Sequence, residues 1–137
     1  MTETLTGGCY CGAIRYESGP PEVFAQCHCR PCSHFSGGGP NYFLMVAPDT
    51  FRYVKGQPKQ YSKTELENAR TRDFCANCGT HLVTHRPGLD KVILKAGSLD
   101  DPDQAGQPSF AIFCAEKAAF HTIPDGMTAF DKLPPTR

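Results

Sequence analysis

The sequence predicts a mainly β fold built from short strands that are joined by turns. Of the 137 residues, 13 are glycine and 12 are proline, and both residue types interrupt regular structure. Few stretches show the 3.6-residue hydrophobic period of an amphipathic helix. Seven of the eight cysteines fall into three tight clusters, as they do in proteins that bind soft divalent metals. These observations predict one β-rich domain over residues 1–137, with bound metal as part of its framework.

Each expected element begins and ends at turn residues or at a cysteine cluster. Alternation of apolar and polar residues, together with β-branched and aromatic residues, marks the strands. Residues 30–35 are expected to form a single helical turn, which ends at the glycine-rich segment 37–40. Residues 97–107 are expected to form a loop, and the tail from Pro124 onward is expected to wrap the surface. Strands are expected at residues 13–17, 22–27, 42–46, 51–54, 59–63 (an edge strand), 69–74, 80–85, 92–96 and 109–114.

The charge balance favours neither nucleic acid nor an anionic membrane as a partner. Lysine and arginine number 14, aspartate and glutamate also number 14, and the formal net charge is zero. Seven thiolates and two zinc ions would bring this to roughly −3. The first eight residues lack the pattern of a secretory signal, and no window is apolar enough to span a membrane. We therefore expect a cytoplasmic protein, with a secreted disulfide framework as the alternative that the cysteine spacing disfavours.

The cysteine spacings suit tetrahedral zinc. In an extended chain, residues two apart share a face with Cα atoms about 6.6 Å apart. Sulfurs bound to one zinc ion at about 2.3 Å lie about 3.7 Å from each other. Cys9 and Cys11 can close this gap if the chain curves, and Cys75 and Cys78 can do so through a tight turn. Gly79, directly after that turn, allows a left-handed residue that frees backbone amides to face the sulfurs.

Two of the clusters together complete one four-sulfur site. Cys9 and Cys11, joined with Cys75 and Cys78, would connect the N-terminal segment to the tip of a distant hairpin. Closed four-ligand zinc sites are usually structural. Zinc binding contributes about 10–16 kcal/mol in small zinc domains, which is as large as the net stability of a whole domain. We therefore expect these four cysteines to hold a structural zinc ion.

The third cluster, Cys27, Cys29 and Cys32, supplies only three ligands. A histidine or Cys114 would close the site as a fourth ligand, or the site would be vestigial and bind metal weakly. In the third alternative, water or a substrate thiolate occupies an open position, as in catalytic zinc sites. Three thiolates make zinc a poor Lewis acid, so its better use is to hold another sulfur as a thiolate. This site therefore favours sulfur chemistry over hydrolysis.

Four histidines are candidate functional groups. His28 lies between two ligands, so in an extended segment it points away from the metal and packs or donates a hydrogen bond, with ligation as the alternative. His34 lies two residues beyond Cys32 and could approach the open position. His81 and His85 are expected on one face of a strand, as ordinary surface or cleft residues.

Three further residues carry weaker expectations. Cys114 is expected to be a buried thiol outside the metal clusters. Arg70 and Arg72 are expected to share one strand face. That face is either solvated or binds a carboxylate of a small anionic substrate.

The cysteines lie in three ordered motifs, namely Gly8-Cys9-Tyr10-Cys11-Gly12-Ala13-Ile14, Cys27-His28-Cys29-Arg30-Pro31-Cys32 and Phe74-Cys75-Ala76-Asn77-Cys78-Gly79-Thr80. These motifs resemble the glutathione-dependent formaldehyde-activating enzyme (GFA) family, which includes the CENP-V/GFA type of zinc domain. Shorter matches run through segments 51–56, 97–102 and 125–127, so the resemblance spans nearly the whole chain. Ser33 and His34 depart from the family, in which Arg or Lys often follows the third cysteine of the middle cluster. Phe120 appears where the family often has Trp.

The resemblance implies a fold, a cofactor set and an activity. The fold is a β-tent of short antiparallel strands around zinc. A structural zinc is assigned to Cys9, Cys11, Cys75 and Cys78, and a second, catalytic zinc to Cys27, Cys29 and Cys32. The activity joins a small thiol, glutathione, to formaldehyde and gives S-hydroxymethylglutathione, so the enzyme is a carbon–sulfur lyase in the reverse direction.

The leading hypothesis is accordingly a zinc-dependent carbon–sulfur lyase that acts on a small thiol–aldehyde adduct. One rival is a non-catalytic β-tent module in which both metals are structural. The other is a redox or metal sensor whose three-cysteine site releases zinc on oxidation.

Overall fold

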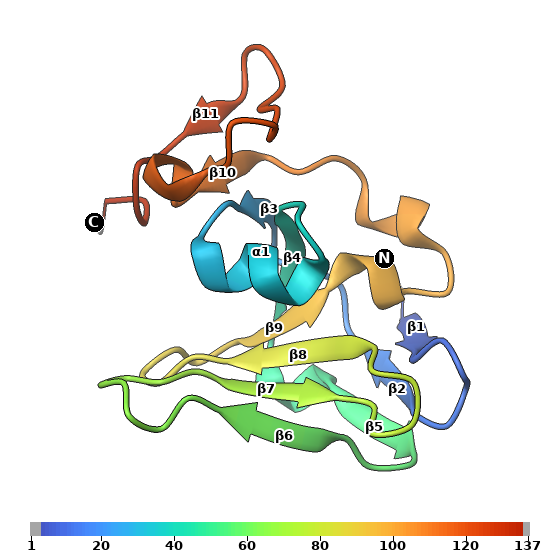
Figure 1. The fold of residues 1–137 in the computed structure, drawn as a ribbon. Coiled ribbons are helices and arrows are strands. Elements are labelled where there is room, and N and C mark those ends of the chain that lie inside the picture. The colour runs from blue at the N-terminus through green and yellow to red at the C-terminus, as the bar shows by residue number, and fades with distance from the viewer. Residues whose placement is uncertain (1–3, 136–137) are drawn as a thin grey trace.

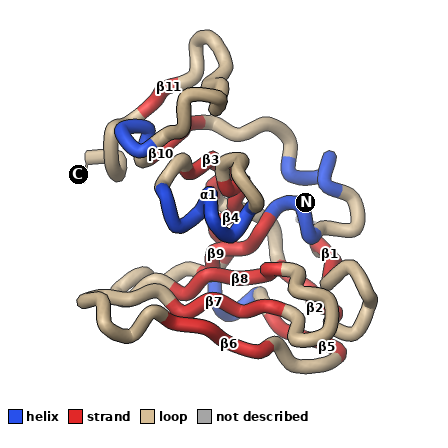
Figure 2. The backbone as a smooth tube through the Cα atoms, in the orientation of Figure 1, coloured by secondary structure: helices blue, strands red, loops and turns tan. Residues whose placement is uncertain are grey.

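The computed structural model describes residues 4–135 and confirms the mainly β prediction. Strands and loops dominate the chain, with one α-helix in the described part, α1 (Arg30–Ser36), and short 3₁₀ turns (Figure 2). Because α1 has seven residues, no helix in this part of the chain could cross a membrane. The strands are β1 Leu5–Gly8, β2 Arg15–Ser18, β3 Val23–Cys27, β4 Asn41–Val46, β5 Arg52–Lys55, β6 Lys59–Ser62, β7 Thr71–Phe74, β8 His81–His85, β9 Val92–Lys95, β10 Phe110–Ile112 and β11 Thr128–Ala129.

The strands form two sheets (Figure 1). The smaller sheet has the order β1-β2-β5, and the larger has the order β11-β10-β3-β4-β9-β8-β7-β6, so β6 is an edge strand as expected. Neighbouring strands are antiparallel except at β10, which is parallel to both β3 and β11. Parallel strands of one sheet need a long crossover. β9 and β10 are parallel strands of this kind, separated in the sheet by β4 and β3, and segment 96–109, with its two 3₁₀ turns, joins them.

The central strands of the larger sheet are buried on both faces. On β4, Leu44 packs into a first core that also takes Tyr16 and Leu5 from the smaller sheet. Its neighbour Phe43 points the other way into a second core with Ile93 and the thiol of Cys32, which belongs to α1. The alternation of side chains along a strand divides the two cores in this way. The smaller sheet therefore covers one face of the larger sheet, and α1 covers part of the other.

Two strands were not expected from the sequence. β1 contains two adjacent glycines, which disfavour strands, but a Cβ atom at Gly7 would collide with the hydroxyl of Tyr16 and the carbonyl of Ser98. Glycine is required there because the backbone approaches the neighbouring side chain so closely. β11 lies in the tail, has two residues, and pairs only with β10 among the described strands.

Candidate functional site

The first cysteine group brings together two pairs of residues that are far apart in the sequence. Cys9 and Cys11 follow β1, while Cys75 and Cys78 form the turn between β7 and β8. One ligand atom from each lies within 4.8 Å of every other. The sulfurs of Cys9 and Cys11 are 3.6 Å apart, and those of Cys11 and Cys75 are 3.8 Å apart. These separations match the edge of a zinc–sulfur tetrahedron.

The surroundings of this group stabilise thiolates. The backbone amide of Ile14 donates to the sulfur of Cys9 at 3.2 Å, and the side-chain amide of Asn77 donates to Cys11 at 3.2 Å. The hydroxyl of Thr80 lies 3.2 Å from the sulfur of Cys78 and, with backbone donors, lowers the pKa of that thiol to about 5. Donors aimed at sulfur favour the charged form that metals bind.

The turn that carries Cys75 and Cys78 has the expected geometry. The amide of Cys75 donates to the carbonyl of Thr80 at 2.9 Å, which closes the hairpin. Gly79 has a φ of 82°, in the left-handed region that favours glycine. The prediction of a hairpin with the two cysteines at its tip is confirmed.

The second group forms where β3 passes into α1. Cys27 ends β3, and Cys29 caps the helix by accepting a hydrogen bond at its sulfur from the amide of Cys32, at 3.3 Å. Pro31 occupies the first turn, where a missing amide is tolerated. The three sulfurs lie within 4.8 Å of one another. A strand end and a helix cap thus direct three thiols to one point.

Protons are shared unequally in this second group. The pKa of Cys32 falls to about 3, first because Cys27 and Cys29 donate hydrogen bonds to it and then because Lys95 and Arg72 are positively charged. The pKa of Cys27 is raised by its hydrogen bonds to the other two sulfurs and by burial. One thiolate is therefore favoured before any metal binds, and a bound metal would displace the remaining protons.

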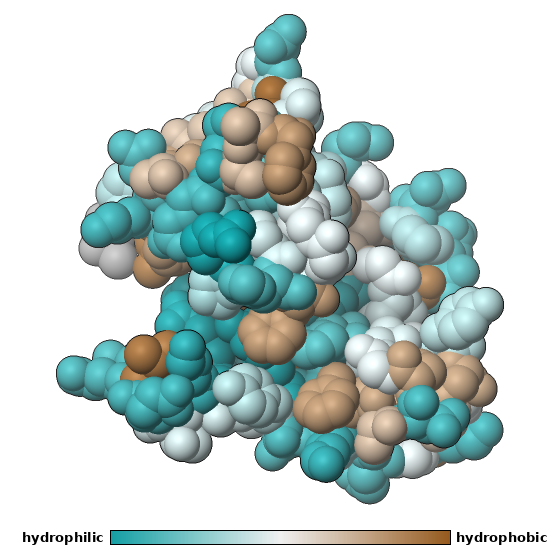
Figure 3. All heavy atoms as spheres, viewed as in Figure 1, coloured by the Kyte–Doolittle hydropathy of each residue, from teal (hydrophilic) through white to brown (hydrophobic). Residues whose placement is uncertain are grey.

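All three thiols of the second group line a cleft of about 1060 Å³. In Figure 3 the surface is hollowed between the part that carries α1 and β10 and the part that carries β6, β7 and β8. Hydrophilic side chains colour much of this hollow. Its volume is slightly above the usual range of about 300–1,000 Å³ for ligand pockets, so the cleft is large enough for a small peptide-like molecule.

A buried histidine pair supports the loop that carries the second group. His28 is 0% exposed, and its Nδ1 lies 3.0 Å from Nδ1 of His121. His121 Nε2 lies 2.6 Å from the carbonyl of Gly38, so it carries the proton and its Nδ1 accepts from His28. His28 Nε2 then accepts from the side-chain amide of Gln26 at 2.9 Å. The expectation that His28 packs and donates a hydrogen bond is confirmed, and burial lowers its pKa.

His34 and Cys114 lie outside both cysteine groups. His34 is exposed and lines the cleft, but no metal-binding group found in residues 4–135 includes it. Cys114 is partly exposed at the start of a 3₁₀ turn, so the prediction of a buried thiol is wrong. The left-handed Phe113 (φ 53°) turns the chain out of β10 just before Cys114, which places this residue away from the core.

The prediction that His81 and His85 share a strand face is also wrong. The ring of His81 packs on Phe35, with centroids 4.9 Å apart, on the cleft side of the sheet. His85 Nε2 instead lies 3.0 Å from the buried carboxylate of Asp73, on the opposite face. A register shift in the pairing of β7 with β8 separates the two positions, because a bulge changes which face the later residues occupy.

Three groups at the site were missed by sequence reasoning. Lys95 is the last residue of β9, and its positive charge interacts with Cys32. A lysine at the end of an otherwise apolar strand was a signal that the sequence offered. Arg86 lines the cleft directly after β8. His121 had no signal, because its partner His28 is 93 residues away in a different segment.

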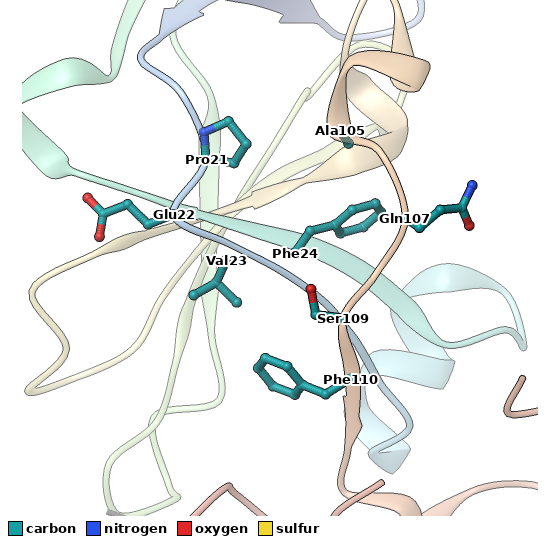
Figure 4. A pocket seen from close by; sticks show the side chains of 8 residues that line it. All are labelled: Pro21, Glu22, Val23, Phe24, Ala105, Gln107, Ser109 and Phe110. Atoms are coloured by element: carbon teal, nitrogen blue, oxygen red, sulfur yellow. The ribbon is translucent and has the colours of Figure 1, made fainter. Parts of the chain in front are cut away.

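A second hollow, of about 240 Å³, lies between β3 and the segment that leads to β10 (Figure 4). In Figure 4 the side chain of Ser109 lies between the rings of Phe24 and Phe110. Val23 and Phe110 also line the larger cleft. The one acidic side chain of the second hollow, Glu22, is paired with Lys91 at 2.6 Å. No thiol or histidine lines it, so its chemistry differs from that of the cleft.

The fold and the two thiol groups define a β-rich protein with two sites that could hold metal ions, one of them at a cleft. The chain belongs to the glutathione-dependent formaldehyde-activating enzyme family, whose model matches residues 4–116. The resemblance seen in the cysteine motifs is thereby confirmed.

Two known proteins are similar to the chain. A Halomonas elongata protein named "Putative glutathione-dependent formaldehyde-activating enzyme" is 28% identical over 111 residues, which cover 76% of this chain and 70% of that protein. A crystal structure of a Rhodobacter sphaeroides protein superimposes with a TM-score of 0.56 and 19% identity, covering 75% of this chain and 96% of that chain. The second similarity concerns the fold alone.

Proposed function

We propose that this protein catalyses the reversible addition of the glutathione thiol to formaldehyde, as a carbon–sulfur lyase in the reverse direction. The observation that carries the proposal is the group of three thiols, Cys27, Cys29 and Cys32, on the wall of a cleft of about 1060 Å³. Family membership supports the same reaction. We place this activity in the cytoplasm and in one domain that spans residues 1–137.

The proposal assigns the two cysteine groups different roles. The closed group of four would hold a structural zinc, and the group of three would hold a second zinc with a position open to the cleft. Both donor sets fit zinc, because clustered thiolates are its preferred structural ligands. In the group of four, the measured sulfur separations also match a zinc tetrahedron. At the second site, zinc supplies affinity for one more sulfur and lowers the pKa of that thiol.

The residues of the chain supply charge and orientation for the reaction. Lys95 and Arg72 add positive charge beside Cys32, which favours anionic sulfur at this end of the cleft. The lone pair of the glutathione sulfur forms a bond to the carbonyl carbon of formaldehyde. The π electrons of the carbonyl move to its oxygen, which takes up one proton in place of the proton that the thiol releases, and becomes the hydroxyl of S-hydroxymethylglutathione. The reverse reaction breaks the same carbon–sulfur bond.

The test is formaldehyde consumption with glutathione, measured above the uncatalysed rate. We expect the wild type to accelerate the reaction and the variant Cys29→Ser to fall to the uncatalysed level. Cys114→Ser is the matched control, because this cysteine lies outside both groups. If wild type and Cys29→Ser both react at the uncatalysed rate, the proposed function is wrong for these substrates. The non-catalytic β-tent module and the redox or metal sensor would then remain as the alternative functions.

A further inference from the structure

Three arginines line the same cleft as the three thiols. Arg72 lies in β7, Arg70 directly precedes β7, and Arg86 directly follows β8. The expectation that Arg70 and Arg72 share one face is confirmed, since both line the same cleft. We call Arg70, Arg72 and Arg86 the arginine face.

The arrangement of the arginine face is unfavourable for the fold by itself. Arg72 pairs with Thr84 across β7 and β8, so extending this register by two positions in the chain places Arg70 opposite Arg86. Like charges directly opposite each other destabilise a sheet. The two guanidinium groups interact, because the charge of Arg70, after the effect of burial, contributes to a lowered pKa of Arg86. Such an arrangement suits an anion that binds between them.

No acidic side chain within residues 4–135 neutralises these arginines. The ion pairs in this part of the chain involve other groups. Glu67 and Glu116 also line the cleft, but neither pairs with the arginine face, and Glu116 accepts a hydrogen bond from the amide of Arg30 at 3.0 Å. The positive charge therefore faces the cleft uncompensated by carboxylates.

Arg72 has a partner within the fold, unlike the other two arginines. It is 8% exposed and stacks on Phe35, with its guanidinium carbon 4.4 Å from the ring centroid. Within residues 4–135, neither Arg70 nor Arg86 takes part in an ion pair or a cation–π contact, so their charge is left for another partner.

A hydroxyl group at the same place also lacks a partner. Thr84 is 5% exposed and lines the cleft, and its Oγ1 is buried with no hydrogen-bond partner in the described structure. Buried hydroxyls are normally paired, because leaving one unpaired costs about 1–3 kcal/mol. Thr84 lies on β8 directly opposite Arg72 and two residues before Arg86, so a ligand bound to the arginine face would accept a hydrogen bond from its hydroxyl.

We propose that Arg70, Arg86 and Thr84 form a carboxylate subsite that selects thiols carrying a carboxylate distant from their sulfur. Guanidinium groups bind carboxylates through paired hydrogen bonds, and the threonine hydroxyl donates a further one. This assignment rests on the proposed function for the thiol end of the cleft, but binding at the subsite itself requires neither metal nor reaction. Uncharged small thiols would be poor ligands of the cleft.

The test uses S-methylglutathione, which keeps both carboxylates of glutathione but cannot react as a thiol. Its binding to the purified protein is measured by isothermal titration calorimetry, alongside the diethyl ester of the same compound. We expect Arg70→Gln and Arg86→Gln each to weaken binding by about 10- to 100-fold, the range for one charge-assisted hydrogen-bonding partner. The matched control is Arg52→Gln, which removes an exposed arginine of the smaller sheet that is paired with Glu17.

Several outcomes would overturn the subsite. These are absence of binding to the wild type, equal binding of the diester and the diacid, unchanged binding by both variants, or displacement by inorganic sulfate at equal concentration. Catalysis with glutathione and an unchanged KM in Arg70→Gln and Arg86→Gln would also overturn it while leaving the proposed function intact. Conversely, selective binding of the diacid without any acceleration of formaldehyde consumption would support the subsite and refute the proposed function.

Discussion

Replacing Cys75 by serine should strongly destabilise the folded protein if the four-cysteine group is structural. The Cys75 side chain is 2% exposed, and its sulfur lies 3.8 Å from that of Cys11. It also accepts a hydrogen bond from the amide of Cys78 at 3.5 Å. Serine keeps the shape of the side chain but offers a neutral hydroxyl, which is a poor zinc ligand. The N-terminal segment would then lose its connection to the β7–β8 hairpin.

The size of the effect follows from the ligand count. A four-thiolate zinc site contributes about 10–16 kcal/mol to folding, whereas a domain of this size has a net stability of about 5–15 kcal/mol. Loss of one ligand should therefore remove more than about 5 kcal/mol, even if three ligands retain some affinity. At about 2–4 °C per kcal/mol, the melting temperature should fall by at least about 10–20 °C.

Thermal unfolding followed by circular dichroism measures this effect, with zinc content determined on the same samples. Cys114→Ser is the control, because this partly exposed thiol belongs to neither group and its replacement should change stability by less than about 0.5 kcal/mol. A Cys75→Ser variant that binds as much zinc as the wild type and melts within a few degrees of it would refute the structural assignment.

Three further predictions concern groups outside the thiols. His121→Ala should lower the free energy of unfolding by about 1–3 kcal/mol in urea denaturation, because it leaves a buried histidine donor unpaired; a loss within error would contradict the role given to this pair. Arg86→Gln should leave stability unchanged or raise it by up to about 0.5 kcal/mol, since it removes repulsion from Arg70, and a loss above about 1 kcal/mol would reveal a structural partner. Asp100→Asn should cost roughly 0.5–1 kcal/mol, the value of a partly exposed ion pair with Arg15. Because that pairing lowers the pKa of Asp100 to about 2, this contribution is present above the ordinary carboxyl pKa and is lost only as the pH falls toward 2; the difference from wild type should therefore stay constant between pH 5 and pH 8, and a change across that window would contradict the assignment.

The sequence was sufficient to predict the local geometry of the cysteine groups. Spacings of two and three residues restrict how far neighbouring thiols can separate, so Cys27, Cys29 and Cys32 had to converge near one point. Gly79 in the left-handed region after the Cys75–Cys78 turn followed from the same reasoning. Most strands were also located correctly, because the β4 and β9 segments alternate or concentrate apolar residues.

Features that depend on distant contacts could not be predicted. The bulge that places His81 and His85 on opposite faces arises from pairing between β7 and β8, which no single-strand pattern records. β1 was missed because its glycines are selected by close packing against Tyr16, and packing of this kind overrides β propensity. The contact of His28 with His121 joins segments 93 residues apart and left no local signal.

Zinc content per chain tests the central claim most directly, namely that the thiols divide into a closed group of four and an open group of three. The account predicts two zinc ions in the wild type, one in Cys29→Ser and two in Cys114→Ser, measured on folded protein after removal of free metal. A single zinc ion in the wild type would contradict the second site. Loss of one zinc ion from Cys114→Ser would show that Cys114 closes the group of three, which would contradict the open position.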